Sequence, residues 1–247
     1  PTVYGIDWNP ESHDDLLRNH FPRLIEGYGY PEKAPDDAQT ECFHEDNGQF
    51  GTADARAAFC LLQKIRPRRI VEVGSGYSTL LMTDINAQFL DGRTSIICVE
   101  PYPRPFMQGL HEAGKIELIQ KRAQEVPAEL FDSLADGDLL FIDSSHVSKT
   151  GSDVNRLILQ VLPRLAAGVY IHVHDIFFPI DYPKDWVIEH GFSWNEQYLL
   201  QALLIGNDQF EVIYGGSLAR AFHREALVGF YGRMVHGSSF WMRKISS

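Results

Sequence analysis

The order of apolar and polar residues changes near Gly51. Before it, residues 1–50 are rich in Pro, Gly, His and acidic side chains, and only SHDDLLRNHF (12–21) has a helical pattern. From Gly51 onward, short apolar runs alternate with segments in which apolar residues recur every three or four positions. We therefore expect an N-terminal arm or cap over residues 1–50 and one α/β domain over residues 51–247.

Four segments of the second part have the apolar spacing of amphipathic helices. They span about residues 52–65, 78–90, 154–165 and 193–206. Thr52 is expected to cap the first of them, and Ser193 with Glu196 forms a capping-box signature at the start of the last. These predicted helices lie between short apolar runs of the chain.

Seven short apolar runs are predicted to be strands: RRIVEV, TSIICVE, IELIQ, DLLFID, GVYIHVHD, FEVIYG and SSFWMRK. Because most of them alternate with helices, we expect a Rossmann-like, doubly wound, mostly parallel seven-stranded sheet with helices on both faces. Ligands bind such sheets at the carboxyl ends of the strands. The polar stretches EVGSGYS, VEP, IDSSH and HVHD all begin where a strand is expected to end, which predicts a site at that edge.

Composition and charge narrow the range of partners. The net charge of −11 argues against a nucleic-acid partner, which would need clustered Lys and Arg. No run of about 18 apolar residues is present, and the N-terminus lacks the pattern of a secretory signal. The cysteines are three and widely spaced, and so indicate neither a disulfide framework nor a zinc site. We expect a cytoplasmic protein that acts on a small molecule, without a nucleic-acid or membrane partner. The N-terminal arm could pack on a second subunit, so a homo-oligomer is possible.

The stretch VEVGSGYST (71–79) has the strand–glycine–helix form that lets backbone amides approach a ligand closely. The dinucleotide fingerprint requires a third glycine, but this chain has Thr79 at that position. Glu72, just before the loop, would repel a pyrophosphate. A nucleotide-cofactor oxidoreductase therefore stays only an alternative interpretation.

The same loop resembles the first motif of the class I S-adenosylmethionine-dependent methyltransferases, roughly E/D-x-G-x-G. The stretches FIDSSHVSKTGSDVN, HVHDIFFPIDYPKDW, WNEQYLLQAL and SSFWMRK are similar to a bacterial subgroup of these enzymes, and more distantly to catechol and macrocin-type O-methyltransferases. The resemblance covers about residues 50–247. It implies S-adenosylmethionine as cofactor, with the binding residues Glu72, Gly74, Ser75, Gly76, Glu100 for the ribose, Ala123 and Gln124 for the adenine, and Asp143 near the methyl group.

Asp143 and Asp175 end the fourth and fifth predicted strands. Adjacent parallel strands lie about 4.8 Å apart, so the two carboxylates could share a metal ion. The catechol and macrocin-type enzymes that the chain resembles carry magnesium at these strand ends. The match is partial: the catechol enzymes have Asn where this chain has Ile176, and the macrocin-type enzymes tend to have an acidic residue where it has His174. Histidine suits manganese or iron better than magnesium. The expected metal set is Asp143, His174 and Asp175, with Mg, Mn or Fe as the ion.

Without a metal, a histidine could remove the proton of an acceptor hydroxyl. His146 and His174 are the candidate bases, with Asp143 beside them. Strand alternation places His172 and His174 on one face, with His172 deeper in the core, and would place Asp175 on the other face if the strand continues to it. The sequence leaves the cation and the base open and slightly favours the base.

The predicted reaction is O-methylation of a sugar or secondary metabolite. A metal-binding enzyme of other chemistry on the same fold remains an alternative. A hypothetical substrate wall lies in the aromatic segment after the fifth strand, at Phe177, Phe178, Tyr182, Trp186 and Trp194.

Overall fold

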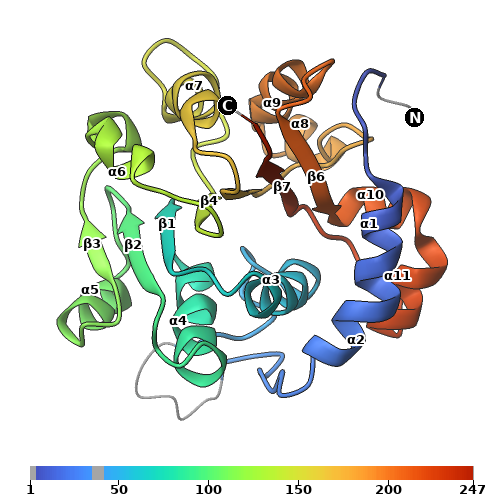
Figure 1. The fold of residues 1–247 in the computed structure, drawn as a ribbon, viewed down its shortest axis with the longest axis horizontal. Helices are drawn as coiled ribbons and strands as arrows, with labels where there is room; N and C mark the ends of the chain where they lie inside the picture. The colour runs from blue at the N-terminus through green and yellow to red at the C-terminus, as the bar shows by residue number, and fades with distance from the viewer. Residues whose placement is uncertain (1–3, 35–41, 247) are drawn as a thin grey trace.

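A seven-stranded sheet forms the centre of the protein in the computed structural model, which describes residues 4–34 and 42–246 (Figure 1). The strand order is β3-β2-β1-β4-β5-β7-β6, and only β7 runs antiparallel to its neighbours. This is the Rossmann-like α/β fold, and the predicted fold class is confirmed. The strands are β1 Arg69–Val73, β2 Ser95–Val99, β3 Glu117–Ile119, β4 Leu139–Ile142, β5 Tyr170–Val173, β6 Phe210–Gly215 and β7 Phe240–Lys244.

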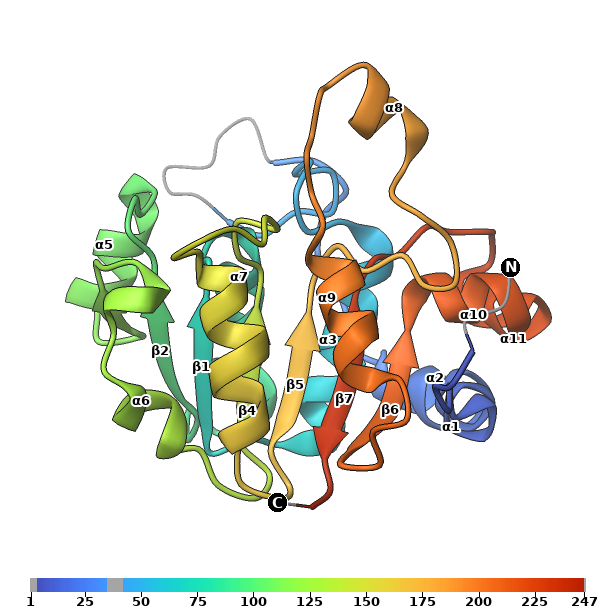
Figure 2. The ribbon, with the colours of Figure 1, turned by 90° about the horizontal axis from the view of Figure 1, so that it is seen from above.

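Helices cover both faces of the sheet, with α7 and α9 in front and α3 behind in Figure 2. In the described residues, no helix combines the length and the apolar character needed to cross a membrane. The α-helices are α1 Pro10–Asp15, α2 Phe21–Leu24, α3 Thr52–Ile65, α4 Tyr77–Phe89, α5 Pro105–Glu112, α6 Ala128–Asp132, α7 Asp153–Arg156, α8 Lys184–Ile188, α9 Glu196–Leu204, α10 Gly216–Phe222 and α11 Arg224–Tyr231. Shorter helical segments are η1 Leu16–His20, η2 Ala123–Glu125, η3 Leu157–Val161 and η4 Leu162–Arg164.

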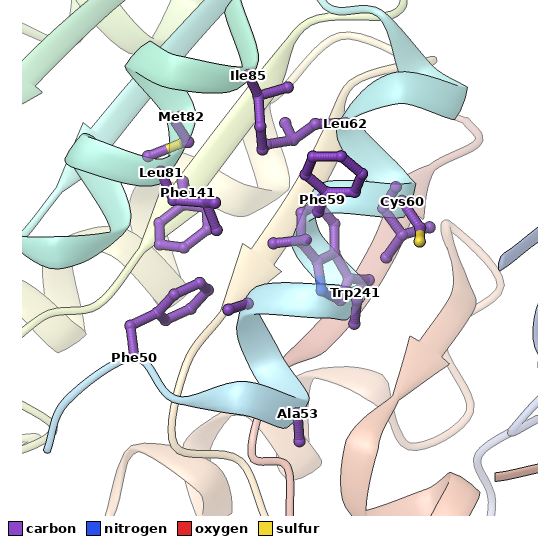
Figure 3. Close-up of a cluster of buried hydrophobic side chains, with 14 of the residues drawn as sticks. Phe50, Ala53, Phe59, Cys60, Leu62, Leu81, Met82, Ile85, Phe141 and Trp241 are labelled. Carbon is purple, nitrogen blue, oxygen red and sulfur yellow. The ribbon is translucent and has the colours of Figure 1, made fainter. Parts of the chain in front are cut away.

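The strands feed two separate hydrophobic clusters, because successive side chains of a strand point to opposite faces. In β1, Ile70 belongs to the cluster beneath α3 and α4, and Val71 belongs to the cluster beneath α7 and α9. Figure 3 shows the first cluster, where Phe50, Phe141 and Trp241 pack edge to face. Burial of these rings holds the segment before α3 against β4, and β4 against β7.

The N-terminal segment packs on the same core. Helices α1, η1 and α2 contact β6, α11 and α3, and Leu16, Leu17 and Phe21 are buried in the first cluster. Residues 35–41 of the predicted arm lie outside the described residues. The division into an arm over 1–50 and a domain over 51–247 stays a prediction.

Two predicted helix starts and one predicted helix differ in the structure. Gly51 is the N-cap of α3, and Thr52 is already its first helical residue. Asn195 is the N-cap of α9, so Ser193 and Glu196 form no capping box there. The single helix expected over 154–165 is divided into α7, η3 and η4, and Pro163 lies in the last of these. Proline cannot donate a helical hydrogen bond, which accounts for the tighter final turn.

His13 joins α1 to the end of β6 as a neutral imidazole. Its Nδ1 lies 3.0 Å from the carbonyl oxygen of Asn9, and its Nε2 accepts from the backbone N–H of Gly215 at 2.8 Å. Burial lowers the pKa of His13 to about 4. Protonation would remove the acceptor that Gly215 needs, because both ring nitrogens would then be donors.

Acid is therefore expected to weaken this junction. The pKa of His13 is lower in the folded state than in the unfolded state, so stability is lost as the pH falls below about 6.5. We expect the free-energy advantage of the wild type over His13→Gln to shrink by about 2 kcal/mol between pH 7.5 and pH 5. Urea unfolding at both pH values measures it. The exposed His190→Gln serves as control, and an unchanged difference for His13→Gln would contradict the assignment.

Candidate active site

A cavity of about 940 Å³ opens at the carboxyl ends of the central strands. Gly74 after β1, Glu100 after β2, Asp143 after β4 and His174 after β5 all line it. The segment that carries α8 rises above this edge of the sheet (Figure 2). The structure thus brings the polar strand ends to one place, as the sequence predicted.

The glycine loop lies directly against the end of β4. Gly74 has a φ of 78°, and its N–H donates to the carbonyl oxygen of Val99 at 3.0 Å. A Cβ atom at Gly74 would lie 1.7 Å from the carbonyl oxygen of Asp143. Only glycine permits both this backbone conformation and this close approach. The loop and Asp143 therefore form one rigid unit.

Glu100 presents its carboxylate to the cavity and is held there by the backbone. One oxygen accepts from the N–H of Ser75 at 3.2 Å, and the other accepts from the N–H of Tyr102 at 2.8 Å. Each carboxylate oxygen can accept more than one hydrogen bond. Glu100 therefore retains acceptor capacity for hydroxyl groups of a ligand.

Glu72 is fully buried below the glycine loop and does not line the cavity. The hydroxyls of Ser78 and Thr79 each donate to its carboxylate at 2.6 Å, which ties the start of α4 to β1. Burial raises the pKa of Glu72 to about 7. Its contacts support the loop from beneath, and direct binding of a cofactor by Glu72 stays a prediction.

The two residues predicted to contact adenine also lie away from this cavity. Ala123 is buried in η2, Gln124 is exposed, and neither is among the described residues that line the cavity. Their assignment to the adenine stays a prediction.

Asp143, His146 and Asp175 converge on one point of the cavity floor. The Nε2 atom of His146 lies 3.3 Å from Oδ1 of Asp143 and 3.6 Å from Oδ2 of Asp175. One potential ligand atom from each of the three residues lies within 4.8 Å of the other two. From the other side, the Nδ1 atom of His146 lies 3.0 Å from a carboxylate oxygen of Glu196.

His174 connects this floor to α3. Its Nδ1 atom lies 3.6 Å from both Oδ1 of Asp143 and Oδ2 of Asp175, and its Nε2 atom lies 3.5 Å from Oδ2 of Asp54. Asp54 also accepts from the backbone N–H groups of Ser238 and Ser239. His174 therefore sits between three carboxylates at the edge of the cavity.

His172 lies in the core, as the alternation of the strand predicted. It is fully buried, its ring stacks on Phe141 with centroids 3.8 Å apart, and its Nε2 atom lies 3.0 Å from the Ser239 hydroxyl. It takes no part in the floor of the cavity.

Two residues of the floor have left-handed backbones. His146 has a φ of 58° and Asp175 a φ of 56°, which is unfavourable for residues other than glycine. Asp175 was expected to face away from His174 only if the strand continued to it, and this condition is not met. Strand β5 ends at Val173, and the turn at Asp175 brings its side chain back to the site. Such backbone outliers often occur at functional sites.

The floor is strongly polarised. Burial alone would lower the pKa of His146, but hydrogen bonds and charge interactions with Asp143 and Glu196 raise it to about 10. Burial would also lower the pKa of His174, but the charges of Asp175 and Asp143 raise it well above its usual value. Against burial, the two imidazoles hold the pKa of Asp143 far below its usual range. A histidine that is protonated at neutral pH cannot accept a proton, which argues against His146 as a general base.

Sequence reasoning missed two carboxylates of this site. Glu196 was interpreted as part of a capping box, but its side chain is buried and faces His146. Asp54 lies within α3, where an acidic residue in the first turn is typical of any helix. In the sequence, Asp54 differs from its neighbours only as an acidic residue between Ala53 and Ala55.

Part of the aromatic segment lines the cavity. Phe177, Trp186 and Trp194 contribute to its wall, whereas Phe178 and Tyr182 are buried in the core. The Trp194 ring lies 4.2 Å from the His146 ring, measured between centroids. The wall therefore begins directly beside the floor.

One comparison matches a family model, and a second finds a relative. Residues 71–176, which include the glycine loop and both strand-end aspartates, match the family model described as "Methyltransferase domain". An uncharacterized protein of Archaeoglobus fulgidus is 33% identical over 155 residues, which cover 60% of this chain and 68% of the relative. The chain belongs to the class I S-adenosylmethionine-dependent methyltransferase family. This decides against a nucleotide-cofactor oxidoreductase, and S-adenosylmethionine is the cofactor of the methyltransferase.

Two solved structures are more distant. The structure titled "cmcI-N160 SAH" is 15% identical and has a TM-score of 0.46, with 86% of this chain and 89% of that chain covered. The plantazolicin methyltransferase BpumL in complex with SAH is 13% identical, with a TM-score of 0.42 and coverage of 95% and 88%. At these values, neither structure bears on the acceptor of the methyltransferase.

Proposed function

We propose that the methyltransferase transfers the methyl group of S-adenosylmethionine to an oxygen atom of a small molecule, a sugar or secondary metabolite. A divalent cation at Asp143, His146 and Asp175 prepares the acceptor. The observation that carries this proposal is the convergence of these three side chains beside the glycine loop.

The loop side of the cavity fits the cofactor. Gly74, Ser75 and Gly76 offer a close backbone approach, and Glu100 offers acceptors for ribose hydroxyls. A Cβ atom at Gly76 would lie 3.9 Å from the Nε atom of Arg104, so the guanidinium stands at the loop. Arg104 is suited to hold the carboxylate of the cofactor.

The cation site fits by charge as well as by geometry. Four carboxylates, those of Asp54, Asp143, Asp175 and Glu196, surround two imidazoles. To bind a cation, Nε2 of His146 must lose its proton. Even with His174 protonated, the carboxylates then outnumber the positive charges, and a divalent cation would offset this excess. Oxygen and imidazole ligands together suit manganese or iron, and oxygen ligands suit magnesium.

In the proposed set, His146 takes the place of the predicted ligand His174, because the Nε2 atom of His146 faces both Asp143 and Asp175. His174 lies at a similar distance from both but also faces Asp54. We assign His174 the role of orienting the two carboxylates, and Glu196 the role of orienting His146. Carboxylates behind a ligating histidine commonly have this function.

A divalent cation held by Asp143, His146 and Asp175 would lower the pKa of an acceptor hydroxyl, so that its proton passes to water in the cavity, and would stabilise the resulting oxyanion. The residues of the chain supply the alignment. Because Gly74 packs on the backbone of Asp143, the cofactor loop and the acceptor floor are held in fixed relation. Methyl transfer is an in-line displacement, and such fixed alignment contributes much of its acceleration. Trp194 covers His146 and limits access of water to the floor.

An assay of methyl transfer to a panel of catechols and sugars tests the proposal. We expect transfer to oxygen that EDTA abolishes and Mg²⁺, Mn²⁺ or Fe²⁺ restores. Full activity in EDTA would contradict the cation. Binding of a metal without S-adenosylhomocysteine binding would favour other metal chemistry on this fold.

Glu100→Gln is expected to weaken S-adenosylhomocysteine binding about 10- to 100-fold, because a charged acceptor for the ribose hydroxyls is lost. Glu117→Gln changes an exposed residue at the start of β3 and should leave binding unchanged. Calorimetric titration measures both. Equal affinity of the wild type and Glu100→Gln would overturn the assignment of Glu100.

A further inference from the structure

The cavity extends beyond the cofactor loop and the cation floor to a wall formed by α10 and the segment before β7. Ser217, Arg220, His236 and Ser238 line it there. This side lies near β5, β7 and β6, away from the glycine loop that follows β1. It is therefore available to the acceptor and not to the cofactor.

Arg220 is held at this wall by its helix. The N–H of Gly216 donates to the carbonyl oxygen of Ser239 at 2.9 Å, and the Ser217 hydroxyl donates to the carbonyl oxygen of Gly237 at 2.9 Å. Residues three apart share one helix face, so Ser217 and Arg220 both face the cavity. The same segment holds the floor, since the Ser238 hydroxyl donates to Asp175 at 3.0 Å.

Arg220 is half-buried and, within residues 4–34 and 42–246, its guanidinium has no hydrogen-bond or ion-pair partner. The acids of the cavity are engaged elsewhere: Glu100 with backbone N–H groups, Asp181 with the Tyr198 hydroxyl and Asp175 with Ser238. Burial and the charge of Arg220 lower the pKa of His236, so His236 adds no competing positive charge near neutral pH. A guanidinium without a hydrogen-bonding partner in a cavity wall is a site for an anion.

Flat rings form another part of the cavity wall. Phe192 and Trp194 stack with an interplanar angle of 14° and centroids 4.9 Å apart, and Trp186 packs at right angles to Trp194. Phe192 and Ile180 are 40% and 43% exposed, so the wall presents apolar surface that a ligand could bury. Aromatic faces bind flat apolar rings and the apolar faces of sugars.

We propose that the acceptor of the methyltransferase is a ring-bearing hydroxy compound with an anionic group, a carboxylate or a phosphate, which Arg220 binds while the ring lies on Phe192 and Trp194. The proposal rests on the function proposed above and adds the charge of the substrate. The anionic group binds at α10, away from the acidic floor, and the hydroxyl group reaches Asp143, His146 and Asp175.

Two matched pairs of compounds test the charge separately for each anion. They are 3,4-dihydroxybenzoate against 3,4-dihydroxybenzamide, and glucose 6-phosphate against glucose. Calorimetric titration into protein saturated with S-adenosylhomocysteine and Mn²⁺ measures their affinities. We expect the anion of one pair to bind at least 10-fold more tightly than its neutral partner, which also tells whether the site takes a carboxylate or a phosphate.

Arg220→Gln should remove this preference and leave the affinity of the neutral compounds unchanged. Arg224→Gln, on the exposed start of α11, should retain it. The inference is overturned if neither anion is preferred, if Arg220→Gln keeps the preference, or if it weakens neutral and charged compounds alike. Failure to bind S-adenosylhomocysteine would instead contradict the proposed function, so the two failures are distinct.

Discussion

Asp175→Asn is expected to lower kcat/KM for methyl transfer about 100-fold or more at limiting Mn²⁺. The substitution removes one negative ligand from the proposed cation site, and an oxyanion-stabilising cation contributes several kcal/mol to a reaction of this kind. Asparagine has the shape of aspartate and tolerates the left-handed backbone that residue 175 adopts. The fold should therefore be retained.

The matched control is Asp91→Asn. Asp91 has a φ of 58°, close to that of Asp175, but it pairs with Arg66 on the surface. Its substitution should change neither transfer nor S-adenosylhomocysteine affinity. Assays across a range of Mn²⁺ concentrations separate weaker cation binding from lost chemistry. Transfer by Asp175→Asn within threefold of the wild type at every concentration would exclude Asp175 from the cation site.

Gly74→Ala is expected to have the second large effect, a loss of about 100-fold in S-adenosylhomocysteine affinity together with a lower melting temperature. The new methyl group would overlap the carbonyl oxygen of Asp143, so the loop or the end of β4 must move. The left-handed backbone adds a cost of about 1–2 kcal/mol for alanine. Both parts of the site should shift, since the loop and Asp143 are in direct contact.

Gly114→Ala separates these two causes. Gly114 has a φ of 68°, but nothing lies within 4 Å of the position its Cβ would take. It should therefore show the backbone cost in thermal unfolding and keep normal affinity for S-adenosylhomocysteine. If Gly74→Ala behaved like Gly114→Ala in both measurements, the close contact with Asp143 would have no functional weight.

The sheet and its functional edge were predictable because they depend on local patterns. The apolar runs ending at Val73, Ile142 and Val173 mark three central strands, and the rule for parallel sheets then brings their polar ends together. The glycine loop was also predictable from a local pattern, because glycines stand between a strand and a helix. In the structure Gly74 has the positive φ that favours glycine.

The details of the floor depend on contacts that sequence spacing does not encode. Asp54 and Glu196 reach the histidines from α3 and α9, far away along the chain. The turn at Asp175 reverses the face that strand alternation predicts. The preference for a histidine base also depended on an assumed neutral imidazole, whereas the surrounding carboxylates raise the pKa of His146 to about 10.

The most direct test of the central claim is a crystal of the protein with S-adenosylhomocysteine and Mn²⁺, measured at a wavelength where manganese scatters anomalously. We expect one strong anomalous peak about 2.0–2.3 Å from a carboxylate oxygen of Asp143, a carboxylate oxygen of Asp175 and Nε2 of His146, with the cofactor sulfur over the glycine loop. A cofactor bound at the loop with no manganese peak at these three residues would contradict a cation-assisted methyltransferase.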